Sequence, residues 1–406
     1  MTTKINNEHK KVYVPNSTDR GNVIRNVPNL RFPEFEGEWE DFLINDVCSE
    51  FKSGKNIKAD SISESGEYPV YGGNGLRGYT SSYNHEGLYV LIGRQGALCG
   101  NVRSVHGKTF ITEHAIAVAG NEISNTSFLH YLFVKMNLGQ YSDQSAQPGL
   151  AVNKLLKIKV VLPSVSEQTK IARFLSLLDE RITTQNKIID KLQSLIKGLE
   201  DNLLDNPLWE KTYLRSFMQF FSTNSLSWEQ LSYEEGEIRN LHYGLIHGFQ
   251  TRGINSASLP MIKNEAVPKQ YISCQVGDVA FADTSEDTGE IAKSVEFVDT
   301  IEGNTICGLH TIHGRDIKNR TVVGFKGFAF NSRYFHNQIK RLAQGTKVFS
   351  ITANNLSSCY VYLPDLETQK AIVKLLKAYE AQLIVSRKTL KQYEKQKQYL
   401  LRQMFI

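Results

Sequence analysis

The 406-residue sequence has no long hydrophobic run: nowhere do about 18 apolar residues follow one another, which argues against a membrane-spanning helix. Its first 25 residues are polar and lack the short apolar run of a secretory signal, so we expect no signal peptide. Cysteine is scarce as well, with five scattered residues: Cys48, Cys99, Cys274, Cys307 and Cys359. In a chain of this length they predict buried thiols in a reducing cytoplasm and not a disulfide framework.

The sequence also has little excess of either charge. The chain has 47 Lys and Arg residues against 42 Asp and Glu, a formal net charge of +5. Such a mild positive charge permits a nucleic-acid partner but does not require one. With 41% hydrophobic residues, 29 Gly and 10 Pro, the composition excludes disordered and fibrous classes, and the length predicts two or three domains.

One segment of the chain occurs twice. Residues 162–171 (LPSVSEQTKI) recur as residues 363–372 (LPDLETQKAI), and the identical Leu, Pro, Gln and Ile share an offset of 201. Each copy follows a β-like run and precedes about 35 residues with apolar positions at steps of four and three, the 3.5-residue period of a coiled-coil seam. Because proline can begin a helix but cannot continue a central strand, each copy predicts the start of a helix roughly 50 Å long.

The predicted seam places one polar residue at the same slot of both helices, Gln185 in the first and Ser386 in the second. Since a single polar seam residue fixes register, this match favours pairing of the two helices with each other; separate docking of each helix on its own globular domain is the alternative. The seam residues are Ile171, Leu175, Leu178, Ile182, Gln185, Ile189 and Leu192, then Ile372, Leu376, Tyr379, Leu383, Ser386, Leu390 and Tyr393.

These features predict a globular, helix, globular, helix order. We expect an N-terminal arm at 1–28, domains at 29–163 and 207–364, and helices at 164–206 and 365–406. A weaker repeat, Trp39-Glu40 with Trp228-Glu229, makes the second globular segment about 12 residues longer. Both segments read as mixed α/β, with helices at 126–136 and 332–342; β-like runs lie at 68–71, 88–92, 116–119, 158–162, 271–272, 279–282, 295–298 and 321–330.

Catalytic motifs fail on inspection. Residues 73–78 fit G-x-G-x-x-G, but a poor helix former follows, so an exposed turn is favoured over a nucleotide site. Gly107-Lys108-Thr109 lacks the first glycine of a P-loop, since position 102 is Val. Cys307, His310 and His313 are metal-ligand types, but no second cluster accompanies them, so we predict no metal there and favour polar core or a DNA-facing surface.

What remains is a set of Arg, Lys, Asn and Gln residues interleaved with aromatics on Gly-rich turns in each half. Arg and Gln can read base edges, while Lys and Arg neutralise phosphates. The candidate DNA-binding residues are Asn74, Arg77, Tyr79, Arg94, Gln95, Arg103 and Lys108, then Gln250, Arg252, Lys263, His310, Arg315, Arg333, Lys340, Arg341 and Lys347. For each residue taken singly, solvated surface is the alternative.

Several of these segments resemble the specificity subunit of Type I restriction–modification systems. They are residues 30–35 (LRFPEF) with Trp39, residues 68–75 (YPVYGGNG), residues 92–96 (IGRQG) with Cys99-Gly100, Gln147-Pro148-Gly149-Leu150, residues 277–285, and the two Leu-Pro helix starts. The resemblance covers roughly residues 29 to 406. It implies an α+β protein with two similar target recognition domains separated by two long antiparallel coiled-coil helices in a pseudo-twofold arrangement.

The resemblance also implies a function and partners. Each domain would read half of a split site in double-stranded DNA, and the chain would be non-catalytic. Two methyltransferase subunits and motor-nuclease subunits would join it, with S-adenosylmethionine, ATP and Mg²⁺ bound in those partners. The alternatives are a coiled-coil interaction protein without DNA specificity, and a self-sufficient DNA methyltransferase or nuclease.

Overall fold

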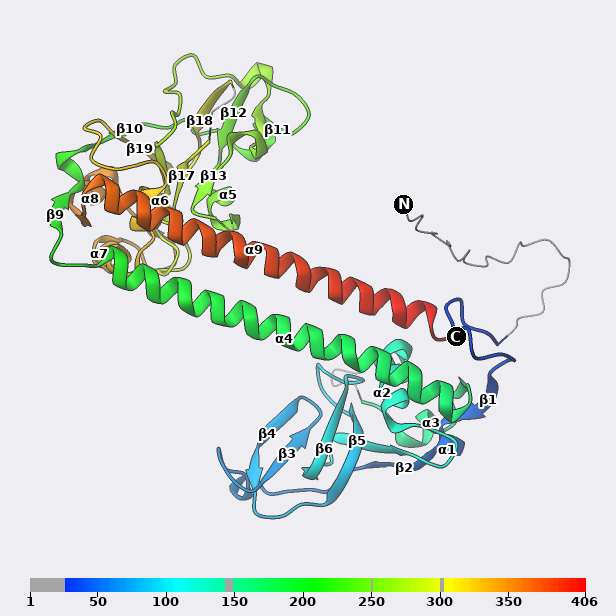
Figure 1. Cartoon of the computed structure of the whole chain (residues 1–406). Helices are drawn as coiled ribbons and strands as arrows, with labels where there is room; N and C mark the ends of the chain where they lie inside the picture. Colours follow the sequence, from blue (N-terminus) through cyan, green and yellow to red (C-terminus); the bar gives the residue numbers. More distant parts are fainter. Residues whose placement is uncertain (1–25, 143–148, 250, 300–302) are drawn as a thin grey trace, which may run out of the picture. The chain divides into compact units, whose positions relative to one another are not determined.

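The structure, a computed structural model, describes residues 26–142, 149–249, 251–299 and 303–406 (Figure 1). Gln147, Pro148, Gln250 and most of the expected N-terminal arm lie outside these ranges. The chain forms two compact units, Met1–Glu180 with Glu394–Ile406, and Arg181–Tyr393. Two long helices, α4 (Val165–Leu204) and α9 (Leu366–Gln403), each continue from one unit into the other.

The first unit is built around a six-stranded sheet of order β2-β7-β5-β6-β3-β4, against which helix α2 packs. A separate antiparallel pair, β1 with β8, leads into α4. Its elements are β1 (Glu40–Leu43), α1 (Ile44–Val47), β2 (Cys48–Ser53), β3 (Tyr68–Gly72), β4 (Gly75–Thr80), β5 (His85–Gly93), β6 (Val102–Ile111), β7 (Ala115–Gly120), α2 (Thr126–Met136), α3 (Val152–Leu155) and β8 (Lys159–Leu162).

The second unit contains a five-stranded sheet, β10-β19-β15-β17-β13, and a four-stranded sheet, β11-β14-β12-β18. The pair β9 with β21 leads into α9. Its elements are β9 (Glu210–Tyr213), β10 (Met218–Phe221), β11 (Leu231–Ser232), β12 (Ile238–Leu241), α5 (Tyr243–Gly248), β13 (Gly253–Ile254), β14 (Met261–Ile262), β15 (Val279–Ala282), β16 (Thr284–Ser285), β17 (Ser294–Phe297), β18 (Asn304–Cys307), β19 (Thr311–Asp316), α6 (Phe325–Ala329), α7 (Arg333–Leu342), β20 (Phe349–Ser350), α8 (Ala353–Ser358) and β21 (Tyr360–Leu363).

The mixed α/β class and the two long helices expected from the sequence are confirmed. Two of the predicted strands are wrong. Residues 271–272 form no strand, and residues 321–330 fold into a turn and the short helix α6. Helix α6 begins where the backbone N–H groups of Gly324 and Gly327 donate to the buried carboxylate of Glu296, at 2.9 and 2.8 Å. A carboxylate at a helix N-terminus stabilises the helix, and this one comes from β17.

The weaker tryptophan repeat is also wrong. Trp39 directly precedes β1, the strand that pairs with β8, and its counterpart in the second unit is Trp209, which directly precedes β9. Trp228 lies in a single 3-10 turn and is 46% exposed, whereas Trp39 is buried. The second globular segment is therefore longer than the first by more than the 12 residues predicted, because the true match begins earlier in the chain.

The repeated Leu-Pro-Gln segment has the same structural role in both units. Gln168 is fully buried; its Nε2 donates to the carbonyl oxygens of Pro163 and Ile123 at 2.8 and 2.9 Å, and its Oε1 accepts from the Asn125 amide at 2.8 Å. Gln168 thus ties the first turn of α4 to the globular part of the first unit.

Gln369 makes the equivalent bonds in the second unit. Its Nε2 donates to Pro364 and Arg320 carbonyls at 2.9 and 3.0 Å, and its Oε1 accepts from the Val322 amide at 3.0 Å. The Gln369 side chain therefore provides a hydrogen-bond partner for each of these three backbone groups.

In each unit the expected seam residues lie on the buried or half-buried face of their helix. In the second unit the side-chain amide of Gln185 donates to the backbone oxygen of Ser386 at 3.1 Å, so the two polar seam slots face each other. Arg252 contacts both Glu200 on α4 and Glu380 on α9. From the Gln185–Ser386 contact to this one, the residue number increases along α4 and decreases along α9. The two helices of this unit therefore run antiparallel.

Replacing both polar seam residues, Gln185→Leu with Ser386→Leu, should raise the free energy of unfolding by about 1 kcal/mol, because apolar surface replaces a polar pair in a half-buried seam. Urea unfolding measures the change. Gln193→Leu, at an exposed position of the same helix, serves as the control and should change little. A large loss from the double variant would show that the seam needs its polar pair.

Within the described residues, none of the helices combines the length and apolar character that crossing a membrane requires.

Candidate nucleic-acid interface

In the first unit, several predicted DNA-binding residues gather around the tip of the β3–β4 hairpin. Asn74 lies in the two-residue turn and is exposed, and Arg77 is exposed on β4. Arg103, on β6, donates to the Asn74 backbone oxygen at 3.4 Å. A side chain at Gly75 would displace this guanidinium, and Gly75 has a φ of +112°, a backbone conformation that side chains rarely adopt. Glycine is therefore required where the hairpin meets this arginine.

The segment after β5 completes this cluster. Gly73 packs against Gly93, whose neighbour Arg94 donates its backbone N–H to the His114 carbonyl at 2.9 Å. The exposed Gln95 lies 3.2 Å from His114 Nδ1 through its Oε1. We call Asn74, Arg77, Arg94, Gln95, Arg103 and His114 the hairpin cluster. His114 was missed by the sequence analysis because nothing in its local pattern shows that it lies beside Gln95.

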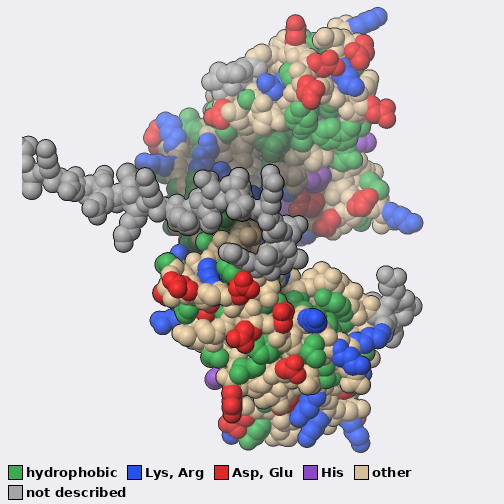
Figure 2. All heavy atoms as spheres, turned by 90° about the vertical axis from the view of Figure 1, so that its right-hand side faces the viewer, with side chains coloured by type: hydrophobic (Ala, Val, Ile, Leu, Met, Phe, Trp, Pro, Cys, Tyr) green, Lys and Arg blue, Asp and Glu red, His purple; other side chains and the backbone are tan. Residues whose placement is uncertain are grey.

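Two candidates of the first unit lie away from this cluster. Lys108 Nζ lies 4.9 Å from the ring centre of Tyr83, and Tyr79 is half-buried, paired through its backbone with Ser63. Acidic and basic side chains both occur on the face of the lower globular body in Figure 2, with neither sign dominating. The overall charge of the unit therefore does not locate a DNA site, whereas the hairpin cluster gathers three arginines with Asn and Gln.

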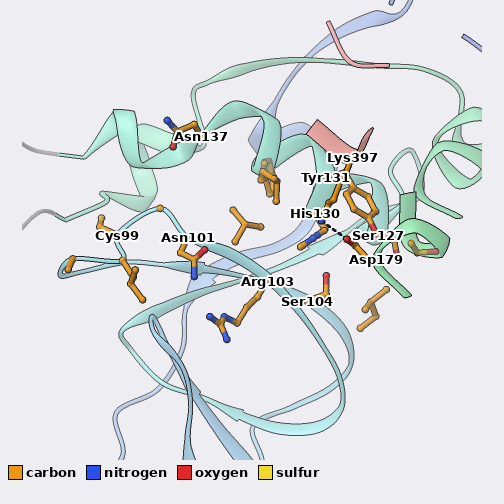
Figure 3. Close-up of a pocket in the computed structure, with 18 residues that line it drawn as sticks. Cys99, Asn101, Arg103, Ser104, Ser127, His130, Tyr131, Asn137, Asp179 and Lys397 are labelled. Carbon is orange, nitrogen blue, oxygen red and sulfur yellow. Dashed lines mark hydrogen bonds and ion pairs between the residues drawn. The ribbon is translucent and has the colours of Figure 1, made fainter. Parts of the chain in front are cut away.

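Arg103 also lines a hollow of about 800 Å³ in the first unit (Figure 3). On the side away from Arg103, the Tyr131 hydroxyl donates to Asp179 at 2.8 Å, and Lys397 Nζ lies 2.5 Å from the same carboxylate. Burial lowers the pKa of His130 to about 4, helped by the charge of Lys397, so this imidazole is neutral at pH 7. The hollow therefore has a paired, neutral end on the helices and a basic end at Arg103.

In the second unit, Arg333 and Lys340 lie on one face of α7 together with Asn337, at spacings of four and three residues. They line a hollow of about 550 Å³ whose walls also include Lys293 and Arg252. The remaining charged lining residues are Lys197, Arg387, Glu200, Asp201, Glu290 and Glu380. Basic groups outnumber acidic ones there, which suits a phosphate-bearing ligand.

Two arginines of the second set are held by carboxylates. Arg315 makes a bidentate pair with the buried Asp278, at 2.8 and 2.7 Å, and also donates to the Ser273 carbonyl. Arg252 lies 3.8 Å from Glu200 and donates its backbone N–H to Glu380. Both arginines therefore have a structural partner already, which weakens their case as base-reading residues.

The other candidates of the second set are spread over the unit. His310 is exposed and 3.2 Å from Asp283. Lys263 is half-buried beside the β14 end, and Arg341 and Lys347 are exposed at and after the end of α7. Among the members of this set that the structure describes, Arg252, Arg333 and Lys340 share one hollow.

Glu380 makes the folding stability of the second unit depend on pH. Burial raises its pKa to about 7, against the opposing influence of Arg252 and Lys377 and with help from Glu200. A carboxyl whose pKa is raised on folding contributes stability that is full below its unfolded value of 4.5 and is lost as the pH rises through 7. We expect the second unit to lose up to about 3 kcal/mol between pH 5 and pH 8 from this group. Urea unfolding of Glu380→Gln should show a flatter pH profile, and the exposed Glu234→Gln should not.

The helices also expose apolar side chains away from the seam. Phe174, Leu177, Ile188 and Leu195 on α4 are 39–50% exposed, and Val385 and Tyr399 on α9 are about 60% exposed. Phe174 is partly covered by Phe32, whose ring packs edge-on at 5.8 Å. Exposed apolar rows on a long helix are typical of a surface that binds another protein.

The glycine-rich segment 73–78 forms the β3–β4 hairpin, as the exposed-turn interpretation predicted. No helix follows it, so it lacks the helix N-terminus that a nucleotide phosphate requires. The five cysteines are free thiols and are buried or half-buried.

A mixed α/β domain occurs twice, each time leading into a long helix, which defines a two-domain scaffold. The family model of the Type I restriction modification DNA specificity domain matches residues 36–194 and 261–395. The chain therefore belongs to the family of Type I restriction–modification specificity subunits, which confirms the resemblance seen in the sequence.

Three relatives illustrate the similarity. The Type I restriction enzyme EcoprrI specificity subunit of Escherichia coli is 41% identical over 165 residues, and the match spans 40% of each chain. The Type I restriction enzyme MjaVIII specificity subunit of Methanocaldococcus jannaschii is 26% identical over 405 residues, 92% of each chain. The crystal structure of the Type I restriction–modification S subunit from M. genitalium has a TM-score of 0.65 at 15% identity, covering 94% of this chain and 99% of that one, and so shares the fold.

Proposed function

We propose that this chain reads DNA sequence for a Type I restriction–modification complex, with each globular domain reading one half of a bipartite site in double-stranded DNA. The observation that carries the proposal is the hairpin cluster, in which arginines, Asn74 and Gln95 gather from three separate segments of the first unit. These side-chain types hydrogen-bond to base edges in the major groove. Arg333 and Lys340 on α7 are the corresponding candidates in the second domain.

The proposal assigns the long helices to partner binding. The exposed apolar residues of α4 and α9 would dock two methyltransferase subunits, and motor-nuclease subunits would join that complex. S-adenosylmethionine, ATP and Mg²⁺ would be held by these partners, and this chain would carry out no chemistry itself. Family membership and the exposed apolar rows support this assignment.

Reading by the hairpin cluster can be tested in the complex with methyltransferase subunits of the same system. Sequencing of methylated genomic DNA should give one bipartite motif for the natural chain. Arg77→Ala and Arg94→Ala should each lower methylation at that motif roughly 5- to 150-fold and relax one half-site, because a bidentate arginine–base pair contributes about 1–3 kcal/mol. The other half-site should stay as it was.

Lys58→Ala removes an exposed positive charge from the same unit and is the matched control. An unchanged motif and rate in both arginine variants would overturn the assignment of the cluster. Methyl transfer to DNA by the purified chain without partners would overturn the non-catalytic role.

A further inference from the structure

Three metal-ligating side chains meet inside the second unit. The Sγ atoms of Cys274 and Cys307 and a ring nitrogen of His313 all lie within 4.8 Å of one another, and all three residues are buried. Cys307 ends β18 in the four-stranded sheet, and His313 lies on β19 in the five-stranded sheet. Cys274 precedes β15, and its backbone N–H donates to the Thr305 carbonyl at 2.7 Å. The cluster thus joins both sheets and a connecting segment.

The distance between the two sulfurs matches thiolates that share a metal. Their separation is 3.6 Å. Two thiolates at about 2.3 Å from a tetrahedral zinc ion lie about 3.8 Å apart, whereas a disulfide would bring the sulfurs to about 2.05 Å. The observed distance is therefore close to the zinc geometry and far from the disulfide.

His313 has the carboxylate partner that metal-binding histidines commonly have. His313 Nε2 lies 2.7 Å from Asp278 Oδ2, which leaves Nδ1 as the nitrogen free for a metal. Metal-binding histidines commonly donate their other N–H to a carboxylate, which fixes the ring and the tautomer. Asp278 is itself fixed by the Arg315 guanidinium and by the Gln275 backbone N–H at 2.8 Å.

The buried charges also balance. Two thiolates neutralise a divalent cation, while Asp278 and Arg315 neutralise each other. This matters because Cys274 and Cys307 belong to an apolar cluster with Leu241, Ile254 and Phe297, where an unpaired charge would be costly. Thiolate and imidazole ligands together favour zinc over harder cations.

We propose that Cys274, Cys307 and His313 bind one zinc ion that ties the two sheets of the second unit together. The site is independent of the proposed DNA reading. Among the described residues no other such group of His, Cys, Asp and Glu occurs, so the zinc belongs to the second unit. The sequence analysis grouped His310 with Cys307 and His313 and predicted no metal. The structure places His310 at the surface beside Asp283 and brings Cys274 to the other two residues in its place.

Metal analysis of the purified full chain tests the site. After expression in zinc-supplemented medium the chain should hold about one zinc ion, and Cys274→Ser, Cys307→Ser and His313→Asn should each lose most of it. Cys359→Ser, a buried thiol of the same unit, and His310→Asn are the matched controls and should keep it. Less than about 0.2 zinc per natural chain, or equal zinc in the cysteine variants, would overturn the proposal.

A second measurement covers variants that fail to fold. Titration of the natural chain with an organomercurial should release zinc in step with thiol modification, and cobalt in place of zinc should give a thiolate-to-cobalt absorption band. Dialysis against a strong chelator should lower the Tm of the second unit by at least about 5 °C, since metal binding adds to folding stability. Recovery of a Cys274–Cys307 disulfide by peptide mapping under non-reducing conditions would overturn the zinc site.

Discussion

Replacing Gln168 by leucine should lower the free energy of unfolding of the first unit by about 3–5 kcal/mol, because a buried polar group left without a partner costs about 1–3 kcal/mol. The leucine would leave three such groups: the carbonyls of Pro163 and Ile123 and the amide of Asn125. Asn125 also caps α2, where its side chain accepts from the Phe128 amide. The loss therefore reaches the start of two helices.

Gln369→Leu should have an effect of similar size on the second unit, where it would orphan Pro364, Arg320 and Val322. Gln193→Leu, at an exposed position of α4, is the matched control and should change stability by less than about 0.5 kcal/mol. Hydrogen exchange can assign each loss to its unit, since protection should fall first at residues 163–175 in one variant and 364–376 in the other. A loss below about 1 kcal/mol in both would mean that water replaces the glutamine bonds.

The long helices could be predicted from sequence because their signal is local. The 3.5-residue apolar period, the proline at each start and the Gln185 and Ser386 slots all lie within the helices themselves. Helix α2 was equally accessible, since an apolar run follows the capping residue Asn125. The repeated Gln168 and Gln369 marked a shared role, but which backbone groups they bind became visible only in the fold.

Which candidate arginines are held by carboxylates and which are free to bind DNA could not be predicted, because their partners are distant in the sequence. Arg315 is held by Asp278, 37 residues away in the chain, and Arg252 meets Glu380, 128 residues away. Arg77 was a candidate of the same kind and is exposed. The tryptophan error has the same origin, since Trp209 is identified as the counterpart of Trp39 only by the pairing of β9 with β21.

Lys326→Met should lower the free energy of unfolding of the second unit by about 3–5 kcal/mol at pH 8, because it leaves a buried charge without its partner. Lys326 Nζ lies 3.0 Å from Glu296 Oε1, and both side chains are at most 2% exposed. Without the ammonium, the carboxylate would keep only the backbone N–H groups of Gly324 and Gly327. The helix α6 that they begin should weaken with it.

The loss should shrink toward pH 5, which separates charge from packing. Burial already raises the pKa of Glu296 despite Lys326, and removal of the ammonium raises it further. A carboxyl whose pKa is raised on folding contributes most to folding stability below its unfolded pKa of 4.5, and this contribution is lost as the pH rises. Urea unfolding at pH 5 and pH 8 measures the difference, with the exposed Lys374→Met as control. An equal loss at both pH values would instead assign the effect to the methylene stem of Lys326 and its hydrogen bond to Thr321, 2.9 Å long.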